Sequence, residues 1–298
     1  MTNGIPAASL LAEVSKCVAK AQGYLLGRQS DAGGFCFYRA EGVDEPNLRD
    51  TYHAIVALNL LGTPVPDPGR VVEFVERARL FGLTYVYYYA FTLGLLGLSN
   101  RIGAQELAQI RDFSIGLPAR IGSTSSRGWF EDTRRKVRLK RRFAGAWDFH
   151  QLVVALLASR IEGGYGEKPN LWDTHSSLAI LDSLGCRHEM RASAAFVDGL
   201  QGLPFGFHLT RDSIMPNLEV AHAGVQCCTL LGLPIRHRTE VLELVLACQT
   251  ADGGFSRRPA ALPDIDLTYR ALQVIALTTG KRQILNRGVF ASALATAC

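Results

Sequence analysis

The sequence predicts an all-α protein built from about six helix pairs that close into a ring. A proline-led segment recurs along the chain, and a glycine-rich turn precedes most of its copies. Signals for β-strands are few. Repeats of roughly 40 residues are typical of stacked helix pairs.

The recurring segment consists of a proline, then Asn or Asp, and then an apolar helix. Four copies begin at Pro46, Pro169, Pro216 and Pro263, and the last three starts are evenly spaced. The wide gap after the first copy has room for two more. We assign these to "TYVYYYAFTLGLLG" (84–97) and "WDFHQLVVALLAS" (147–159). Each copy is interpreted as the second, inner helix of a pair.

A glycine turn that carries an aromatic residue comes before most copies, as in "QSDAGGF" and "QTADGGF". Paired glycines end helices and permit close backbone turns. The helices after these turns are apolar nearly all round, which is typical of the inner helices of a closed double ring. No linker or break in composition interrupts the pattern, so we expect one domain over residues 1–298.

The composition narrows the class of protein. No apolar run is long and clean enough to span a membrane. Seven cysteines, an odd number without a CxxC pair, favour reduced thiols and a cytoplasmic location.

Much of the net charge of +5 lies in the run "RRKVRLKRR", residues 134–142. The interpretations of this run are a solvated loop, a diphosphate clamp, a membrane-surface patch and a nucleic-acid patch. Nucleic acid is not expected as a partner, because the rest of the chain is not basic and no binding motif accompanies the run.

The turn and the "DTYHAIVALNLLG" that follows it together resemble the prenyltransferase and squalene-cyclase repeat superfamily, over nearly the whole chain. The resemblance implies an α/α toroid around a deep apolar cavity. It also implies an isoprenoid substrate, such as a prenyl diphosphate or a prenylated aromatic. Members of the superfamily include protein prenyltransferase β subunits and class II terpene cyclases.

The acidic residues at the starts of the inner helices have a structural explanation. In "NLRD" and "NLWD", Asn47 and Asn170 are good N-caps, and Asp50 and Asp173 stand three residues later. A polar cap followed by an acid at the third helical position stabilises a helix start. We therefore interpret both aspartates as structural.

The segment "DIDL" departs from this frame. Asp264 takes the cap position, Leu267 replaces the usual acid, and Asp266 stands where the repeat requires none. The segment resembles the D-x-D-D motif of class II terpene cyclases, which implies Asp266 as the catalytic acid and Asp264 as its partner. Protonating an alkene requires a neutral carboxylic acid, which apolar burial favours and a helix N-terminus opposes.

An alternative chemistry uses a metal. Prenyltransferase β subunits bind zinc through a D-x-C pair and a histidine, which align with Asp264, Asp266 and His53, although Asp266 replaces the cysteine. The resemblance thus implies an alternative site for zinc or magnesium. The leading hypothesis needs no cofactor.

Aromatic and histidine side chains are expected to line the cavity. Three histidines share one position in the repeat, tyrosines fill it elsewhere, and the tyrosines of "YVYYY" lie within one helical face. Aromatic faces stabilise carbocations. The substrate-binding candidates are His53, Tyr85, Tyr88, Tyr89, Trp147, His150, Trp172, His175, His222 and Tyr269.

Three functional hypotheses follow. The first is a class II-like terpene cyclase that protonates its isoprenoid through Asp266. The second is a prenyltransferase with a metal near Asp264, Asp266 and His53. The third is a non-catalytic isoprenoid-binding scaffold. Contact with a membrane surface is compatible with all three.

Overall fold

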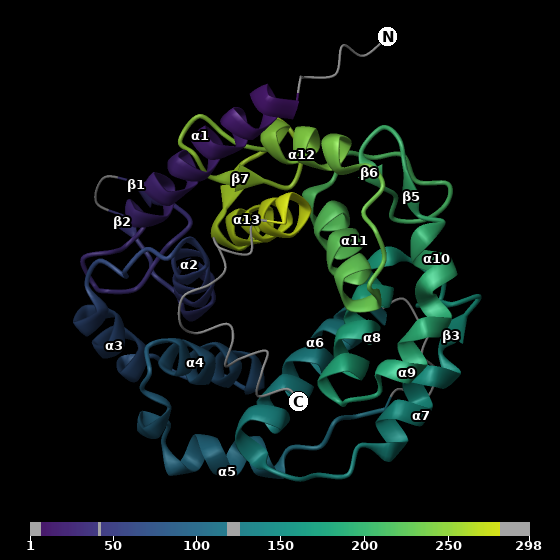
Figure 1. Cartoon of the computed structure of the whole chain (residues 1–298). Coiled ribbons are helices and arrows are strands. Elements are labelled where there is room, and N and C mark those ends of the chain that lie inside the picture. Colours follow the sequence, from purple (N-terminus) through teal and green to yellow (C-terminus); the bar gives the residue numbers. More distant parts are fainter. Residues whose placement is uncertain (1–6, 41–42, 118–125, 281–298) are drawn as a thin grey trace.

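The helices of the protein form two concentric rings (Figure 1), described here from a computed structural model in which residues 7–40, 43–117 and 126–280 are placed. Each inner helix packs against the next, and the last packs against the first, so the ring is closed. In chain order the inner helices are α2 (Leu48–Leu61), α4 (Leu83–Leu95), α6 (Ser126–Leu139), α8 (Leu171–Ser183), α11 (Leu218–Leu231) and α13 (Ile265–Thr279).

The outer ring holds the first helix of each pair (Figure 1). Its members are α1 (Ala7–Leu26), α3 (Pro68–Arg77), α5 (Ala104–Asp112), α7 (His150–Ala158), α9 (Arg187–Met190) with α10 (Ala194–Asp198), and α12 (Arg238–Ala247). Three short helical turns complete the helical part: η1 (Ser99–Arg101), η2 (Lys140–Ala144) and η3 (Arg191–Ser193). The predicted closed ring of six helix pairs is confirmed within the described residues.

Short antiparallel hairpins connect four outer helices to the following inner helices. They pair β1 (Arg39–Ala40) with β2 (Val43–Asp44), β3 (Arg160–Ile161) with β4 (Gly164–Tyr165), β5 (Gln201–Gly202) with β6 (Gly206–Phe207), and β7 (Phe255–Ser256) with β8 (Pro263–Asp264). The predicted glycine-aromatic turns that end at Gly166 and Phe207 coincide with the second and third hairpins. The turns that end at Phe35 and Phe255 are closed by the bridges Gln29–Phe35 and Gln249–Phe255 and lead into the first and fourth hairpins.

The turn after α12 helps to close the outer ring. The Gln249 side chain donates to the carbonyl of Cys17 on α1 at 2.8 Å and to that of Gly253 at 3.0 Å. Gly253 has φ +94°, and a Cβ there would lie 2.4 Å from the Lys20 carbonyl oxygen. Only glycine permits this approach of the last turn to the first helix.

The predicted helix caps are present. Asn47 accepts a hydrogen bond from the Asp50 amide at 2.9 Å and donates to its carboxylate at 2.8 Å. Asn170 and Asp173 repeat both bonds at 3.0 and 2.8 Å. Asp50 and Asp173 are therefore structural, as the repeat frame predicted.

One predicted inner helix is wrong. Within the segment 147–159, residues 150–158 form α7, which lies in the outer ring. The inner position belongs to α6, which contains residues 134–139 of the basic run. Helix α6 buries Phe130, Val137 and Leu139 against its neighbours and carries charged side chains between them. An inner helix thus needs apolar residues only where it packs, because the hollow that it faces here is polar. The solvated-loop interpretation of residues 134–139 fails for the same reason.

None of the described helices has the length and apolar character needed to cross a lipid bilayer.

Candidate active site

The starts of the inner helices share one end of the ring. The first amides of α8 and α11 donate to carbonyls in the loop before the next inner helix, Leu171 to Leu209 and Leu218 to Arg257, both at 2.9 Å. We call this end the N-terminal rim. It comprises the described segments that lead into the inner helices: residues 36–40, 43–47, 78–82, 113–117, 166–170, 208–217 and 256–264.

Asp266 lies just inside this rim and is held by several cations. Arg270, one turn further along α13, donates to its two carboxylate oxygens at 2.9 and 3.0 Å. Arg49 of α2 donates at 3.1 Å, and His53 Nε2 lies 3.4 Å away. Burial raises the pKa of Asp266, but Arg270, His53 and Arg49 together hold that pKa well below its usual range.

The ionised state of Asp266 differs from what an alkene-protonating acid requires. A carboxyl group whose pKa is held well below its usual range by neighbouring cations is ionised at neutral pH. The sequence correctly located a buried carboxyl group at this position. Arg270 and Arg49 donate to this carboxyl group, and their positive charges oppose the neutral form that protonation of an alkene requires.

Asp264 acts as the N-cap of α13. Its Oδ1 accepts hydrogen bonds from the amides of Asp266 at 2.6 Å and Leu267 at 3.3 Å. Its Oδ2 lies 3.9 Å from Arg49. Asp264 thus fixes the backbone of Asp266, which is the cap role that the sequence predicted.

Helix α6 supplies the positive charge of the hollow. Arg135 pairs with Glu131 at 2.6 Å. Arg138 donates to the Tyr87 hydroxyl, and its guanidinium lies 4.9 Å from the Phe91 ring centroid. Arg134 has no hydrogen-bond or ion-pair partner among the described residues. Within the described part of the chain, two half-buried arginines one turn apart therefore form no ion pair with a carboxylate, and cations removed from water usually have such a partner.

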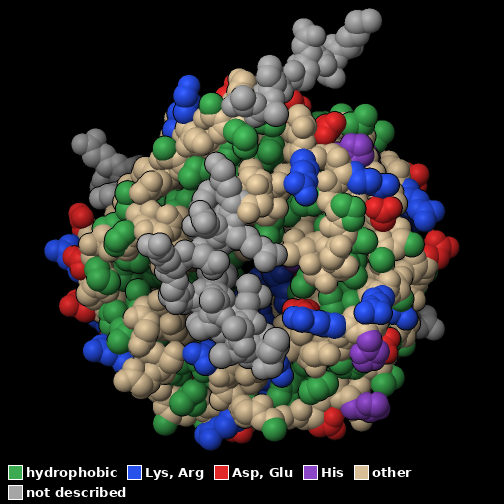
Figure 2. Space-filling model, in the orientation of Figure 1, with side chains coloured by type: hydrophobic (Ala, Val, Ile, Leu, Met, Phe, Trp, Pro, Cys, Tyr) green, Lys and Arg blue, Asp and Glu red, His purple; other side chains and the backbone are tan. Residues whose placement is uncertain are grey.

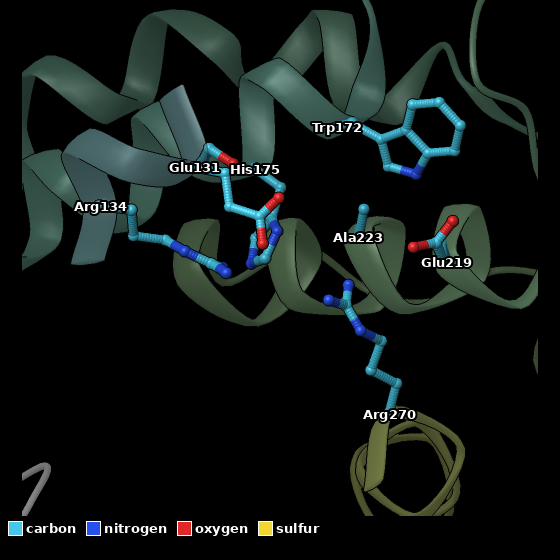
Figure 3. Close-up of a pocket in the computed structure, with 8 residues that line it drawn as sticks. Glu131, Arg134, Trp172, His175, Glu219, Ala223 and Arg270 are labelled. Carbon is cyan, nitrogen blue, oxygen red and sulfur yellow. The ribbon is translucent and has the colours of Figure 1, made fainter. Parts of the chain in front are cut away.

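A polar pocket joins α6 to three other inner helices. It is lined by Glu131 and Arg134 of α6, Trp172, His175 and Ser176 of α8, Glu219 and Ala223 of α11, and Arg270 of α13. In Figure 3, Arg134 and Arg270 extend from separate helices toward His175. Figure 2 shows the molecule hollowed near its centre, with basic side chains visible in the hollow.

The two predicted histidines His175 and His222 face each other, with ring centroids 5.7 Å apart. His222 Nε2 lies 2.8 Å from the Gln273 side-chain oxygen. Burial and the nearby Arg270 lower the pKa of His222 to about 3, and burial and Arg134 put the pKa of His175 well below its usual value. Both imidazoles are therefore neutral at pH 7.

Aromatic side chains of α2, α4 and α13 form a buried cluster. Tyr52 contacts Tyr87 and Tyr88 at centroid distances of 5.7 and 5.5 Å, and His53 contacts Tyr88 and Tyr269 at 5.7 and 6.0 Å. His53, Tyr88 and Tyr269 were predicted here. Tyr87 was missed, although its position one residue before Tyr88 on α4 was visible in the sequence.

Other candidates lie elsewhere. His150 is exposed at the start of the outer helix α7, so its predicted position in the inner ring is wrong. Trp147 stacks against Phe149 beside that helix. Tyr85 is 43% exposed, and the Tyr89 hydroxyl contacts the Arg101 carbonyl at 3.4 Å.

Tyr85 packs against Phe81, so of the three tyrosines only Tyr88 joins the cluster with Tyr52 and His53. Trp172 lines the polar pocket, and its role in binding a substrate stays a prediction.

The residues of the alternative metal site are close together but are engaged otherwise. Both oxygens of Asp266 bind arginine, and Asp264 caps the helix. Across residues 7–40, 43–117 and 126–280, no three His, Cys, Asp or Glu side chains form a metal-binding group.

A closed double ring of helices around a central hollow is an α/α toroid. The family model for the prenyltransferase alpha-alpha toroid domain matches residues 5–84 and 196–297. These ranges are more than half of the chain, so the chain belongs to this family, and its function is isoprenoid-related.

The same fold is found in a solved structure of a variant of the type II terpene cyclase MstE from Scytonema, in complex with the substrate geranylgeranyl dihydroxybenzoate. The two chains are 11% identical, with a TM-score of 0.51 over 94% of this chain and 100% of that one. No curated protein matches the sequence significantly.

Proposed function

We propose that the protein is an enzyme that binds a prenyl diphosphate in the central hollow and converts its isoprenoid chain. Arg134 and Arg138 are proposed to hold the diphosphate. The observation that supports this most strongly is that neither arginine has a carboxylate partner among the described residues. The planar guanidinium group matches the geometry of phosphate oxygens.

The other side chains of the hollow fit the same substrate. Arg270 and Arg49 face two carboxylates, Asp266 and Asp264, so the positive charge left for a ligand is mainly that of α6. Tyr52, Tyr87 and Tyr88 present aromatic rings beside these arginines, where they can stabilise a carbocation.

The reaction would begin at the bond between the allylic carbon and the diphosphate oxygen. When this bond breaks, both electrons leave with the oxygen, and the arginines stabilise the released diphosphate. A double bond of the same chain, or an acceptor molecule, then attacks the allylic cation. Loss of a proton ends the reaction, and the neutral imidazole of His175 lines the pocket as an acceptor for it.

A binding measurement tests this proposal. Geranylgeranyl diphosphate should bind the protein much more tightly than geranylgeraniol, which has the same chain without the anion. Arg134→Gln or Arg138→Gln should weaken diphosphate binding about 10- to 100-fold, since one hydrogen bond to a charged group contributes about 1.5–3 kcal/mol.

Arg141→Gln and Arg142→Gln provide the matched control, because both side chains belong to the same basic run but are exposed on η2. These variants should bind the diphosphate as tightly as the unaltered protein. Equal binding of the alcohol and the diphosphate would contradict the proposal.

Protonation by Asp266 is the second candidate function. The observation that favours it is the burial of this carboxyl group, which by itself raises the pKa and so opposes the effect of the arginines. A prenylated aromatic without a diphosphate separates the two candidates. Turnover of such a substrate that survives Arg134→Gln and is abolished by Asp266→Asn, under conditions in which circular dichroism shows that this variant is folded, would favour the acid over the diphosphate site.

A further inference from the structure

The N-terminal rim carries an unusual number of exposed apolar side chains. Thirteen large apolar side chains are exposed in the described part of the chain, and seven of them lie in the rim segments defined above. These seven are Phe37, Tyr38, Phe81, Leu117, Ile214, Met215 and Leu262. Leu262, Phe81 and Ile214 are the most exposed, at 85%, 70% and 68%.

The opposite rim provides an internal comparison. It consists of the segments that leave the inner helices: residues 62–67, 96–103, 140–149, 184–186 and 232–237. None of the thirteen exposed side chains lies in these segments. Their large apolar residues are folded inward instead: Ile102 is buried, and Phe143 and Ile235 are partly buried against the core. The two rims therefore differ in how far their apolar side chains are exposed, and not only in how many apolar residues they contain.

Basic side chains lie between the apolar ones. Arg79, Lys168, Arg211, Arg257 and Arg258 are exposed in the rim segments, against the exposed acids Glu45, Glu167 and Asp212. Apolar side chains flanked by Lys and Arg are typical of surfaces that lie on anionic lipid, where the apolar groups enter the acyl boundary and the cations meet the headgroups. Exposed apolar patches of this kind mark interaction sites.

The site described above is reached from the same rim. Arg49 and Arg257 have side chains that are 47% and 59% exposed, yet they contact the buried carboxylates of Asp266 and Glu219. Trp172, Glu219 and Asp266 are each the second residue of an inner helix. A surface resting on this rim would thus lie directly over the site.

We propose that the N-terminal rim docks on the surface of a membrane that contains anionic lipids. The apolar side chains stand on separate loops around a ring, an arrangement that fits a planar lipid surface better than a single protein groove. If the proposed function is correct, the isoprenoid chain can pass from the bilayer into the hollow without crossing water.

Vesicle sedimentation with the full chain tests this proposal. The protein should sediment with vesicles of phosphatidylcholine and phosphatidylglycerol in equal parts, and more weakly with phosphatidylcholine alone. The triple variant Ile214→Ser, Met215→Ser and Leu262→Ser should lower vesicle binding at least about 10-fold, since each exposed apolar side chain loses its burial in lipid.

The matched control changes Leu11→Ser and Val154→Ser, which are exposed at 43% and 52% on the outer helices α1 and α7. This variant should bind vesicles as the unaltered protein does, and so should Arg134→Gln, because the vesicles contain no prenyl diphosphate. Failure of the diphosphate site and failure of the docking surface are therefore distinguishable.

Two results would overturn the proposal. One is the absence of binding to either vesicle, and the other is equal binding by the triple variant and the unaltered protein. If the rim instead mediates self-association, vesicle binding will be absent and sedimentation velocity will show a dimer that the triple variant loses.

Discussion

Asp266→Asn should destabilise the fold strongly, because Asp266 and Arg270 form a buried ion pair. Their side chains are 9% and 19% exposed, and the carboxylate accepts two hydrogen bonds from Arg270 and one from Arg49. Asparagine offers one oxygen and no charge, so a buried guanidinium loses its partner. Breaking such a pair costs about 3–5 kcal/mol, and we expect the free energy of unfolding to fall by that amount.

Urea denaturation at pH 7 measures this loss. Glu73→Gln is the matched control, since Glu73 and Arg77 form an ion pair with the same four-residue spacing at 3.0 Å but are 66% and 73% exposed. Surface pairs of this kind contribute about 0–1 kcal/mol. The reasoning is refuted if Asp266→Asn lowers the free energy of unfolding no more than Glu73→Gln does.

The pH dependence of stability offers a second test of the same pair. The pKa of Asp266 in the folded protein lies below its unfolded value, so this carboxylate contributes stability above roughly pH 4 and loses it as the pH falls through the folded pKa. The Asp266→Asn variant should lack this acid-labile part of the stability.

Three further predictions concern the scaffold and the site. Gly253→Ala should destabilise the fold by about 1–3 kcal/mol, because the added Cβ would strain the backbone and clash with the first helix. Gly23→Ala lies in an open part of α1 and should stabilise the fold by about 0.5–1 kcal/mol. Thermal unfolding of both variants measures the difference. Asn170→Ala should cost about 1 kcal/mol in chemical denaturation, and no loss would show that the cap is dispensable. Burial lowers the pKa of His53 to about 4, so as the pH falls the unfolded chain binds this proton before the folded protein does. The free energy of unfolding should therefore fall by about 1.4 kcal/mol per pH unit between pH 6.5 and pH 4. His53→Gln should flatten this slope, whereas His188→Gln, which changes an exposed histidine, should not.

The parts of the fold that depend on local sequence were predictable. The cap bonds of Asn47 and Asn170 involve residues three apart, and the glycine turns repeat a fixed pattern, so one repeat informs the next. Ring closure followed from the number of repeats and the apolar inner helices.

The position of helix α6 was harder to predict, because a run of basic residues was expected to be solvated. The sequence did contain a warning. The 49 residues between Gly97 and Trp147 were left without an assigned inner helix, although the last three copies start only 47 residues apart. A charged inner helix was the missing element, and its presence indicates that the hollow is polar at this level.

The ionisation state of Asp266 depends on one contact within its own helix and on one contact with a residue that is distant in the sequence. Arg270 stands four residues further along the same helix, so this pair was visible in the sequence. Arg49 is 217 residues away and reaches Asp266 only because the ring closes. Alignment of the repeats showed that Asp266 is an acidic residue that helix capping does not require. The alignment contained no information about the cations that surround Asp266 in the folded protein.

The most direct test of the proposed diphosphate site is a crystal structure of the protein with a non-hydrolysable analogue of geranylgeranyl diphosphate. We predict that the diphosphate oxygens lie within hydrogen-bond distance of the Arg134 and Arg138 guanidinium groups, with the isoprenoid chain against Tyr52 and Tyr88. A diphosphate bound outside the ring, for example at the exposed Arg141 and Arg142, would contradict the assignment.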